Sequence, residues 1–385
     1  MTSKKAHALL GPSSAERWLN CPPSARLSEK YPDTTSEFAL EGTDAHELCE
    51  LKLKKSLKQI RSSKVLKDPS GSLKYYNEDM ERYTNEYVEY VLDIYNQCKK
   101  CCEDTDIIVE QELDFSNYVP EGFGTGDCII VSDEKLIVID FKYGKGVEVS
   151  AKDNPQMKLY GLGADNIYGS LYDYKNVELH IFQPRLANIS SFNINLDELK
   201  NWGEETVKPL AEQAFNGEGE MKCGKWCRFC KAKKKCAKRF VTNAKFTEYD
   251  FKESPEVTDE QINEILPFMD ELIAWAKDIK EYCLSEALVG KKWDGFKLVE
   301  GRSSRTITDA DEVAKILTNA GFNPYEQKLL SITALGKLVG TKKLNELIGE
   351  FIVKPQGAPV LVDINDKRPE FNSAKNDFKD FKEGE

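Results

Sequence analysis

Two aspartates and a lysine lie in a pattern that could bind a metal ion. Asp127 follows a glycine near the start of a β-like segment, and Asp140 and Lys142 follow the continuous apolar run 136–139. A carboxylate beside a buried strand is costly unless it is paired or bound to a metal. Two carboxylates with waters and phosphate oxygens form a typical Mg²⁺ site, and a lysine there can stabilise developing negative charge. The pattern indicates metal-dependent hydrolysis of a phosphodiester bond.

An ordinary surface ion pair is the alternative interpretation of Asp140 and Lys142, and it is the more frequent one for an isolated Asp-x-Lys sequence. Three further features favour a site. The first is His46, which could supply a neutral metal ligand, although a lone histidine is more often structural. The second is the pair Gln156 and Tyr160, spaced i and i+4 on a predicted helix, which could position DNA or the lysine. The alternative is a Tyr160 packed in the core and a solvated Gln156.

The cysteines are the third feature. The chain has 11 cysteines, and without a secretory signal these are more often metal ligands, catalytic groups or core residues than disulfides. Cys227, Cys230 and Cys236 follow a C-x2-C-x5-C spacing, and Cys21 stands alone far upstream. These four could bind Zn²⁺ or an iron–sulfur cluster. Cys223 is a rival fourth ligand, and we assign the remaining six cysteines to packing or surface positions.

Charge and composition limit the class of protein. The 385 residues are 40% hydrophobic and 31% charged, and no apolar stretch is long enough to span a membrane. We therefore expect a globular cytoplasmic protein with no membrane partner. The net charge of −11 argues against nucleic acid, yet residues 222–239 hold nine basic side chains and no acidic one. We expect DNA to contact Lys225, Arg228, Lys231, Lys233, Lys234 and Lys235.

The elements that must position these groups follow an order typical of an α/β protein. Short β-branched runs separated by turns predict strands, and apolar side chains at helical spacing predict helices. The stretch 51–75 is rich in lysine and turn residues, and we expect a surface loop there. The strands are predicted at 107–115, 128–132, 135–144 and 176–184, and the helices at 15–21, 42–55, 75–102, 155–167 and 196–215.

This order predicts a mixed sheet flanked by helices, in a first domain over residues 1–245. The pattern changes after about residue 247, where cysteines become rare and helical periodicity dominates. We expect a smaller, mostly helical domain over 246–365. The polar and charged segment 366–385 is typical of a disordered acidic tail.

Six motifs in one order resemble the RecB-like branch of the PD-(D/E)XK nucleases over residues 1 to about 240. The closest resemblance is to the subgroup with an iron–sulfur cluster, which includes AddB-type recombination nucleases and CRISPR-adaptation exonucleases. The motifs are Cys21, G-x3-H at Gly42–His46, G-x-G-D at Gly124–Asp127, D-F-K at Asp140–Lys142, Q-x3-Y at Gln156–Tyr160, and Cys227-x2-Cys230-x5-Cys236.

The resemblance implies a restriction-endonuclease-like core, dependence on Mg²⁺ or Mn²⁺, and cleavage of DNA, usually from an end. It implies that His46, Asp127 and Asp140 bind the metal, that Lys142 is catalytic with Gln156 and Tyr160 beside it, and that Cys21, Cys227, Cys230 and Cys236 hold a [4Fe-4S] cluster, with Zn²⁺ as the alternative. Two features differ from relatives. The chain lacks the P-loop of a helicase motor. The acid of its D-F-K motif is Asp140, at a position where relatives carry either Asp or Glu.

The region after residue 247 resembles phage-encoded proteins described as domains of unknown function. We therefore expect a DNA exonuclease of phage recombination, replication or repair, working beside a phage single-strand annealing or single-strand binding protein. The alternatives are a non-catalytic DNA-binding or assembly protein on a nuclease fold, and an endonuclease or an RNA-directed nuclease. The order of the motifs indicates neither the polarity of cleavage nor the oligomeric state.

Overall fold

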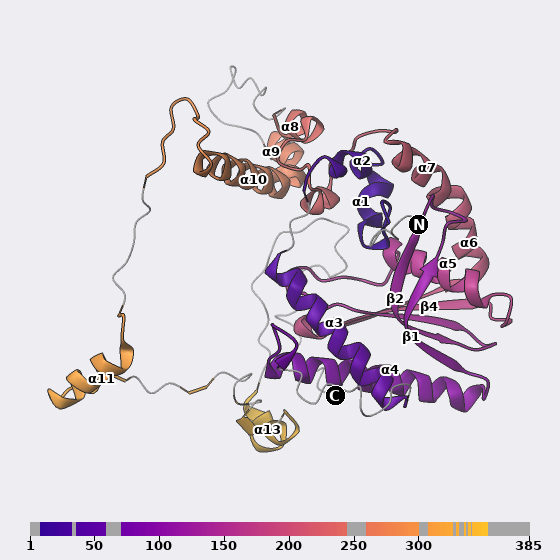
Figure 1. The fold of residues 1–385 in the computed structure, drawn as a ribbon, viewed down its shortest axis with the longest axis horizontal. Helices are drawn as coiled ribbons and strands as arrows, with labels where there is room; N and C mark the ends of the chain where they lie inside the picture. The colour runs from indigo at the N-terminus through magenta and orange to yellow at the C-terminus, as the bar shows by residue number, and fades with distance from the viewer. Residues whose placement is uncertain are drawn as a thin grey trace, which may run out of the picture. The chain divides into compact units, whose positions relative to one another are not determined.

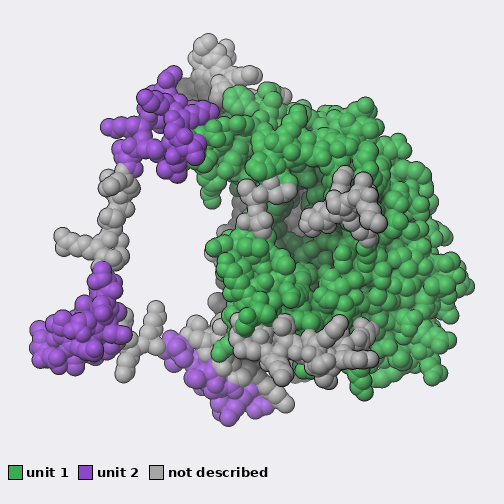
Figure 2. Space-filling model, in the orientation of Figure 1, with its two compact units in different colours: residues 1–286 green, residues 287–385 purple. Residues whose placement is uncertain are grey.

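A computed structural model describes residues 8–32, 36–58, 71–244, 259–299, 307–325, 329–330, 335, 338–339 and 341–352. The chain divides into two compact units, Met1–Glu286 and Ala287–Glu385 (Figure 2). The expected boundary at 245/246 falls in a stretch outside the described residues, as does the expected tail at 366–385. None of the described helices is both long enough and apolar enough to cross a bilayer.

A five-stranded sheet forms the centre of the first unit (Figure 1). The strands pair in sequence order, and all neighbours are antiparallel except β3 and β4, which the helix α5 (Pro155–Tyr168) connects in parallel. The predicted class, a mixed sheet flanked by helices, is confirmed. The strands are β1 (Asp106–Asp114), β2 (Phe123–Val131), β3 (Leu136–Phe141), β4 (Asn176–Gln183) and β5 (Asn188–Asn195).

Helices cover both faces of this sheet and form two separate cores. On one face the core includes Leu136 and Val138 of β3, and on the other it includes Ile137 and Ile139. Alternate side chains of a strand point to opposite faces, so β3 is buried throughout and reads as a continuous apolar run. The first face packs against α1 (Ala15–Asn20), α2 (Ser24–Glu29), α5, α6 (Leu196–Trp202) and α7 (Lys208–Asn216), and the second against α3 (Glu37–Ser56) and α4 (Glu78–Cys101).

The loop expected at 51–75 is shorter than predicted. Helix α3 continues to Ser56, because Leu53 is buried against α4 and Lys52 donates hydrogen bonds to Thr84 and Asn85 there. Residues 59–70 lie outside the described part of the chain.

The first unit ends in a cysteine-rich segment and helices that pack on it. Its elements are η6 (Lys225–Phe229), α8 (Ala237–Ala244), α9 (Asp259–Ile265) and α10 (Met269–Leu288). Arg239 is buried and pairs with Asp278 of α10 at 2.6 Å and with Glu271. This ion-pair cluster joins α8 to α10. The described parts of the second unit form α11 (Ala310–Asn319) and α13 (Thr341–Ile348).

Gly124 on β2 lets the N-terminal turn η1 (Pro12–Ser14) approach the sheet. A Cβ atom at Gly124 would lie 2.7 Å from Cγ of Pro12 and 3.2 Å from the ring of Tyr160. Gly42, inside α3, has no atom within 4 Å of the same position. The first glycine is required by packing, and the second is not.

We expect Gly124→Ala to lower the free energy of unfolding by about 1–3 kcal/mol, because the methyl group overpacks the contact with Pro12. Gly42→Ala is the matched control, and it should raise stability by up to about 1 kcal/mol because alanine favours the helix. Chemical denaturation measures both. A Gly124→Ala protein as stable as the unmodified chain would contradict the close approach of η1.

Candidate active site

Strand register places three carboxylates side by side across β1, β2 and β3. Pairing of Cys128 with Ile139 sets Asp127 opposite Asp140, and pairing of Val109 with Cys128 sets Glu110 opposite Asp127. Asp127 and Asp140 follow the last pair of the β2–β3 ladder, and Glu110 lies at a gap in the β1–β2 ladder beside Asp127. We call Glu110, Asp127 and Asp140 the acid row.

The backbone of Glu110 departs from the regular strand. Its φ of 56° is in the left-handed region, and the ladder between Val109 and Gln111 omits the Glu110–Asp127 pair. Such a conformation costs a non-glycine residue about 1–3 kcal/mol and is found most often at functional sites. The local strain accompanies a carboxylate that faces Asp127 and His46.

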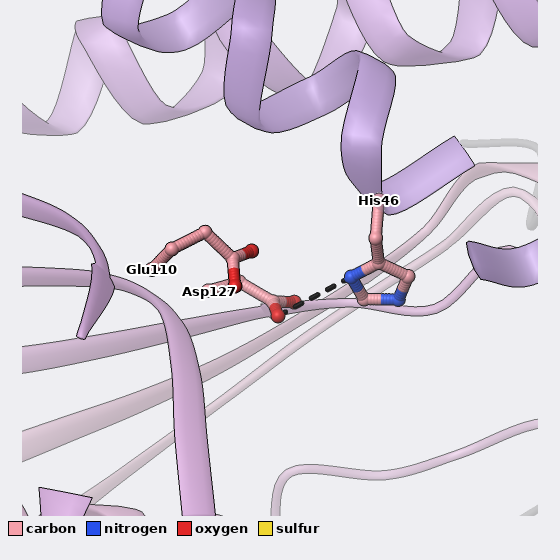
Figure 3. Close-up of side chains that lie close together, drawn as sticks. All are labelled: His46, Glu110 and Asp127. Carbon is pink, nitrogen blue, oxygen red and sulfur yellow. Dashed lines mark ion pairs between the residues drawn. The ribbon is translucent and has the colours of Figure 1, made fainter. Parts of the chain in front are cut away.

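His46, Glu110 and Asp127 form a group that could hold a divalent cation. One ligand atom from each lies within 4.8 Å of the other two, and Figure 3 shows the His46 ring and both carboxylates turned toward one another. His46 Nδ1 lies 3.2 Å from Oδ1 of Asp127, while the backbone N–H of Phe141 donates to its Oδ2 at 2.7 Å. Helix α3 thus brings His46 to the acid row, as expected. Asp140, expected as the third ligand, is not part of this group.

The protonation of this group reflects an excess of negative charge. Burial lowers the pKa of His46, but the carboxylate of Asp127 outweighs it and raises the pKa to about 9. Burial and the charge of Asp127 raise the pKa of Glu110 to about 7. Burial would also raise the pKa of Asp127, but His46 holds it below its usual value. A cation bound here would replace the protons that these shifts favour.

Asp140 belongs to a second cluster, with Lys142 and two side chains of α5. Asp140 is 2% exposed, and its Oδ2 forms an ion pair with Nζ of Lys142 at 2.9 Å. Gln156 joins the cluster by accepting from Lys142 at 3.2 Å and donating to Asp140 at 3.3 Å. Gln156 also donates to the hydroxyl of Tyr160 at 3.2 Å. Tyr160 is buried in the core, as the alternative interpretation expected, but Gln156 is bonded within the cluster rather than solvated.

The same chain contains a surface ion pair with identical spacing. Asp173 and Lys175 lie 2.7 Å apart, with their side chains 87% and 72% exposed. Asp140, in contrast, lies at the end of the fully buried strand β3. Burial separates a candidate catalytic pair from an ordinary ion pair, which the Asp-x-Lys spacing cannot do.

Glu110 was not predicted from the sequence. Glu110 follows a β-branched run and precedes Gln111. An acid at such a position is normally interpreted as a strand residue that faces solvent. Pairing the predicted strand 107–115 with the one after it would have set this acid opposite Asp127. Its left-handed backbone has no signal in the sequence.

The four predicted cysteine ligands meet at one small cavity. It lies between α1 and the segment 222–239, which we call the cysteine segment, and its lining includes Cys21, Cys227, Cys230 and Cys236. Burial raises the pKa of the Cys21 thiol, and that of Cys227 to about 12. The rival Cys223 is not among the lining residues.

The six basic residues predicted to bind DNA lie on different sides of the cysteine segment. Lys233 pairs with Asp278 of α10 at 2.9 Å, and Lys235 lies over the ring of Tyr282. Lys234 is partly buried. The other three, Lys225, Arg228 and Lys231, are exposed.

We expect Glu110→Gln to weaken Mn²⁺ binding by at least about tenfold, because it removes one anionic ligand from the group with His46 and Asp127. Glu112→Gln is the matched control, since Glu112 is the next acid on β1 and is exposed. Isothermal titration calorimetry with Mn²⁺ gives both affinities. Equal losses in the two variants would argue against a cation at this group.

Comparison with known proteins gives matches to solved structures and to a protein family. The solved structure titled "Crystal structure of SSO0001" is 18% identical, over 58% of this chain and 96% of that chain, with a TM-score of 0.23. A similarity of this size supports no statement about activity. Residues 7–369 match the family described as "Protein of unknown function (DUF2800)". Because this match extends over most of the 385 residues, the chain belongs to the DUF2800 family.

Proposed function

We propose that this protein is a divalent-metal-dependent deoxyribonuclease that degrades DNA from its ends. The observation that carries the proposal is the acid row, with His46 on one side and the buried Asp140–Lys142 pair on the other. Such a set is suited to a phosphodiester, because the scissile phosphate is anionic and its hydrolysis develops further negative charge.

The donor set fits Mg²⁺ or Mn²⁺. Both are hard cations that prefer carboxylate oxygens, and an imidazole ligand is more typical of Mn²⁺ than of Mg²⁺. The buried Asp140 carboxylate is paired with Lys142 at 2.9 Å, and it would serve a cation or its waters in exchange for that ammonium. When bound, the metal would polarise the phosphate and lower the pKa of a bound water.

Lys142 would supply positive charge at the phosphate. Its ammonium lies 2.9 Å from Asp140 and 3.2 Å from the Gln156 carbonyl. Burial lowers the pKa of Lys142, but the Asp140 carboxylate outweighs it and raises the pKa above its usual value, so the side chain is a fixed cation. Gln156 orients this ammonium, and Tyr160 orients Gln156 through its hydroxyl.

The resemblance to RecB-like nucleases supports the finer parts of the proposal. The six motifs occur in the same order, and they suggest DNA as the substrate, attack from an end, and a role in phage recombination, replication or repair. A single-strand annealing or single-strand binding protein as partner rests on this resemblance alone.

We further propose that the four cysteines hold a [4Fe-4S] cluster. All four line one cavity, which supports a single inorganic group shared by Cys21 and the cysteine segment. Four cysteine thiolates are the usual ligand set of a [4Fe-4S] cluster, and Zn²⁺ is the alternative.

We expect Asp140→Asn and Lys142→Met each to reduce Mg²⁺- or Mn²⁺-dependent DNA degradation by at least about a hundredfold. Asp140→Asn removes the carboxylate that holds Lys142 and could bind the cation, and Lys142→Met removes positive charge at the phosphate. Asp173→Asn is the matched control, since Asp173 has the same spacing from a lysine but is exposed. The assay uses end-labelled linear DNA beside closed circular DNA and RNA. Loss of the linear DNA alone indicates an exonuclease, and the released label shows its polarity.

Two outcomes of this assay would contradict the proposal. Full activity in Asp140→Asn would show that this site does not carry out the cleavage. A folded, unmodified protein that binds DNA but cleaves no substrate with either metal would indicate a binding or assembly protein instead. Cleavage of circular DNA or of RNA would keep the nuclease and change its class.

We expect the purified protein to contain about four iron atoms per chain, as a [4Fe-4S] cluster requires. Cys21→Ser should lose most of this iron because Cys21 lines the cavity, whereas Cys223→Ser should retain it. Metal analysis and visible absorption measure both. Stoichiometric zinc without iron would replace the cluster by a zinc site and leave the nuclease proposal standing.

A further inference from the structure

The cysteine segment exposes a phenylalanine between its two buried cysteines. Cys227 and Cys230 are 7% and 8% exposed, whereas Phe229 is 69% exposed. The short helix η6 sets this alternation, because its turn directs both cysteines toward the cavity. Trp226 steadies the turn by donating from Nε1 to the carbonyl of Lys222 at 3.1 Å. Phe229 is therefore held outward by its neighbours.

The basic residues of the segment divide into two groups. Lys233, Lys235 and Arg239 contact α10 through Asp278, Tyr282 and Glu271. The charges of Lys233 and Arg239 are paired within the fold.

The second group lies close to Phe229 in the sequence. Lys225 and Arg228 are exposed, and the Arg228 guanidinium lies 5.8 Å from the centroid of the Phe229 ring. No acidic residue occurs between positions 222 and 239. An exposed aromatic ring can stack on another ring, and cations without a neighbouring acid in the sequence can bind negative charge. Both features suit a polyanion whose units also carry aromatic rings.

We propose that Phe229, with Lys225 and Arg228, forms a stacking platform for single-stranded nucleic acid. The ring would stack on one base, and the two cations would lie along the neighbouring phosphates. Stacking accepts any base, because every base has a π-face, so this contact would not depend on sequence.

The inference rests on the proposed function and names its substrate class more closely. Bases within a duplex are stacked on each other and do not present a face to Phe229. A platform of this kind selects a single-stranded end or overhang over a blunt duplex. A phosphate-binding surface alone would hold duplex and single strand without this distinction.

The test measures binding without cleavage. The full-length protein is titrated, with no added Mg²⁺ or Mn²⁺, into fluorescein-labelled oligo(dT) and into a blunt duplex of equal length, and anisotropy gives the affinities. Phe229→Ala should weaken binding to oligo(dT) by about 5- to 100-fold, the range for loss of one stacked base, with little change for the duplex. Phe229→Trp should restore it. Phe240→Ala is the control, because Phe240 is 57% exposed but packs edge-on against Trp275.

The contribution of the cations is measured separately, from the salt dependence of binding. Arg228→Gln should reduce the slope of log affinity against log salt concentration by about 0.7, the value for one phosphate contact on a single strand. Lys233→Gln should leave the slope unchanged, because the charge of Lys233 is already paired with Asp278 at 2.9 Å. Circular dichroism and iron content check that each variant is folded.

Equal oligo(dT) affinity in Phe229→Ala and the unmodified protein would overturn the inference, as would equal losses for duplex and single strand. Retention of oligo(dT) binding with loss of binding to a purified annealing protein would show that Phe229 docks a protein instead. The outcome is separate from catalysis. A protein that binds oligo(dT) through Phe229 but cleaves nothing would contradict only the proposed function, and active cleavage without any effect of Phe229 would contradict only the platform.

Discussion

The antiparallel register of β1, β2 and β3 is the constraint on which the candidate site depends. It brings Glu110, Asp127 and Asp140 to neighbouring positions on adjacent strands, where like charges destabilise the pairing. The row can exist because His46 and Lys142 lie beside it. Compensation is incomplete, since the pKa values of His46 and Glu110 are both raised. The remaining negative charge is what a divalent cation would neutralise.

Helix α5 determines how Asp140 is used. Gln156 lies on this helix and holds both Asp140 and Lys142, so the second half of the site depends on how closely α5 packs against β2 and β3. Tyr160 on α5 and Pro12 of η1 both lie against Gly124. Helix α1, which follows η1, contacts α5 and the cysteine segment. The acid row and the cysteine cavity are therefore supported by one N-terminal segment, which explains why residues far apart in the chain belong to the same motif set.

The cysteine segment has a structural side and an exposed side. Its structural side faces the cavity and α10, where the buried Arg239 is paired with Asp278 and Glu271. An unpaired buried charge would be strongly destabilising, so this ion-pair cluster fixes the position of α8 against α10. The exposed side carries Phe229 with Arg228. A net charge of −11 for the whole chain hides this local asymmetry.

Much of the fold was predictable because it depends on local patterns. The apolar run 136–139 and its turn signals predicted a buried strand and a hairpin, and the spacing of Gln156 and Tyr160 predicted a shared helix face. The residue types at positions 46, 127, 140 and 142, and the cysteine spacing, indicated the chemistry without coordinates. These signals lie within a few residues of each other, or in side chains whose chemistry is specific.

Tertiary structure alone decided which groups meet. Glu110 reads as a solvent-facing acid in its strand, and only strand pairing and its left-handed backbone bring it to Asp127. The spacing of Asp140 and Lys142 recurs at Asp173 and Lys175, and burial distinguishes the two pairs. The choice of Cys21 over Cys223 at the cavity likewise depends on where α1 packs. The sequence determined the elements and the kinds of side chain; their proximity, burial and charge compensation arise from contacts between distant segments, which local patterns do not encode.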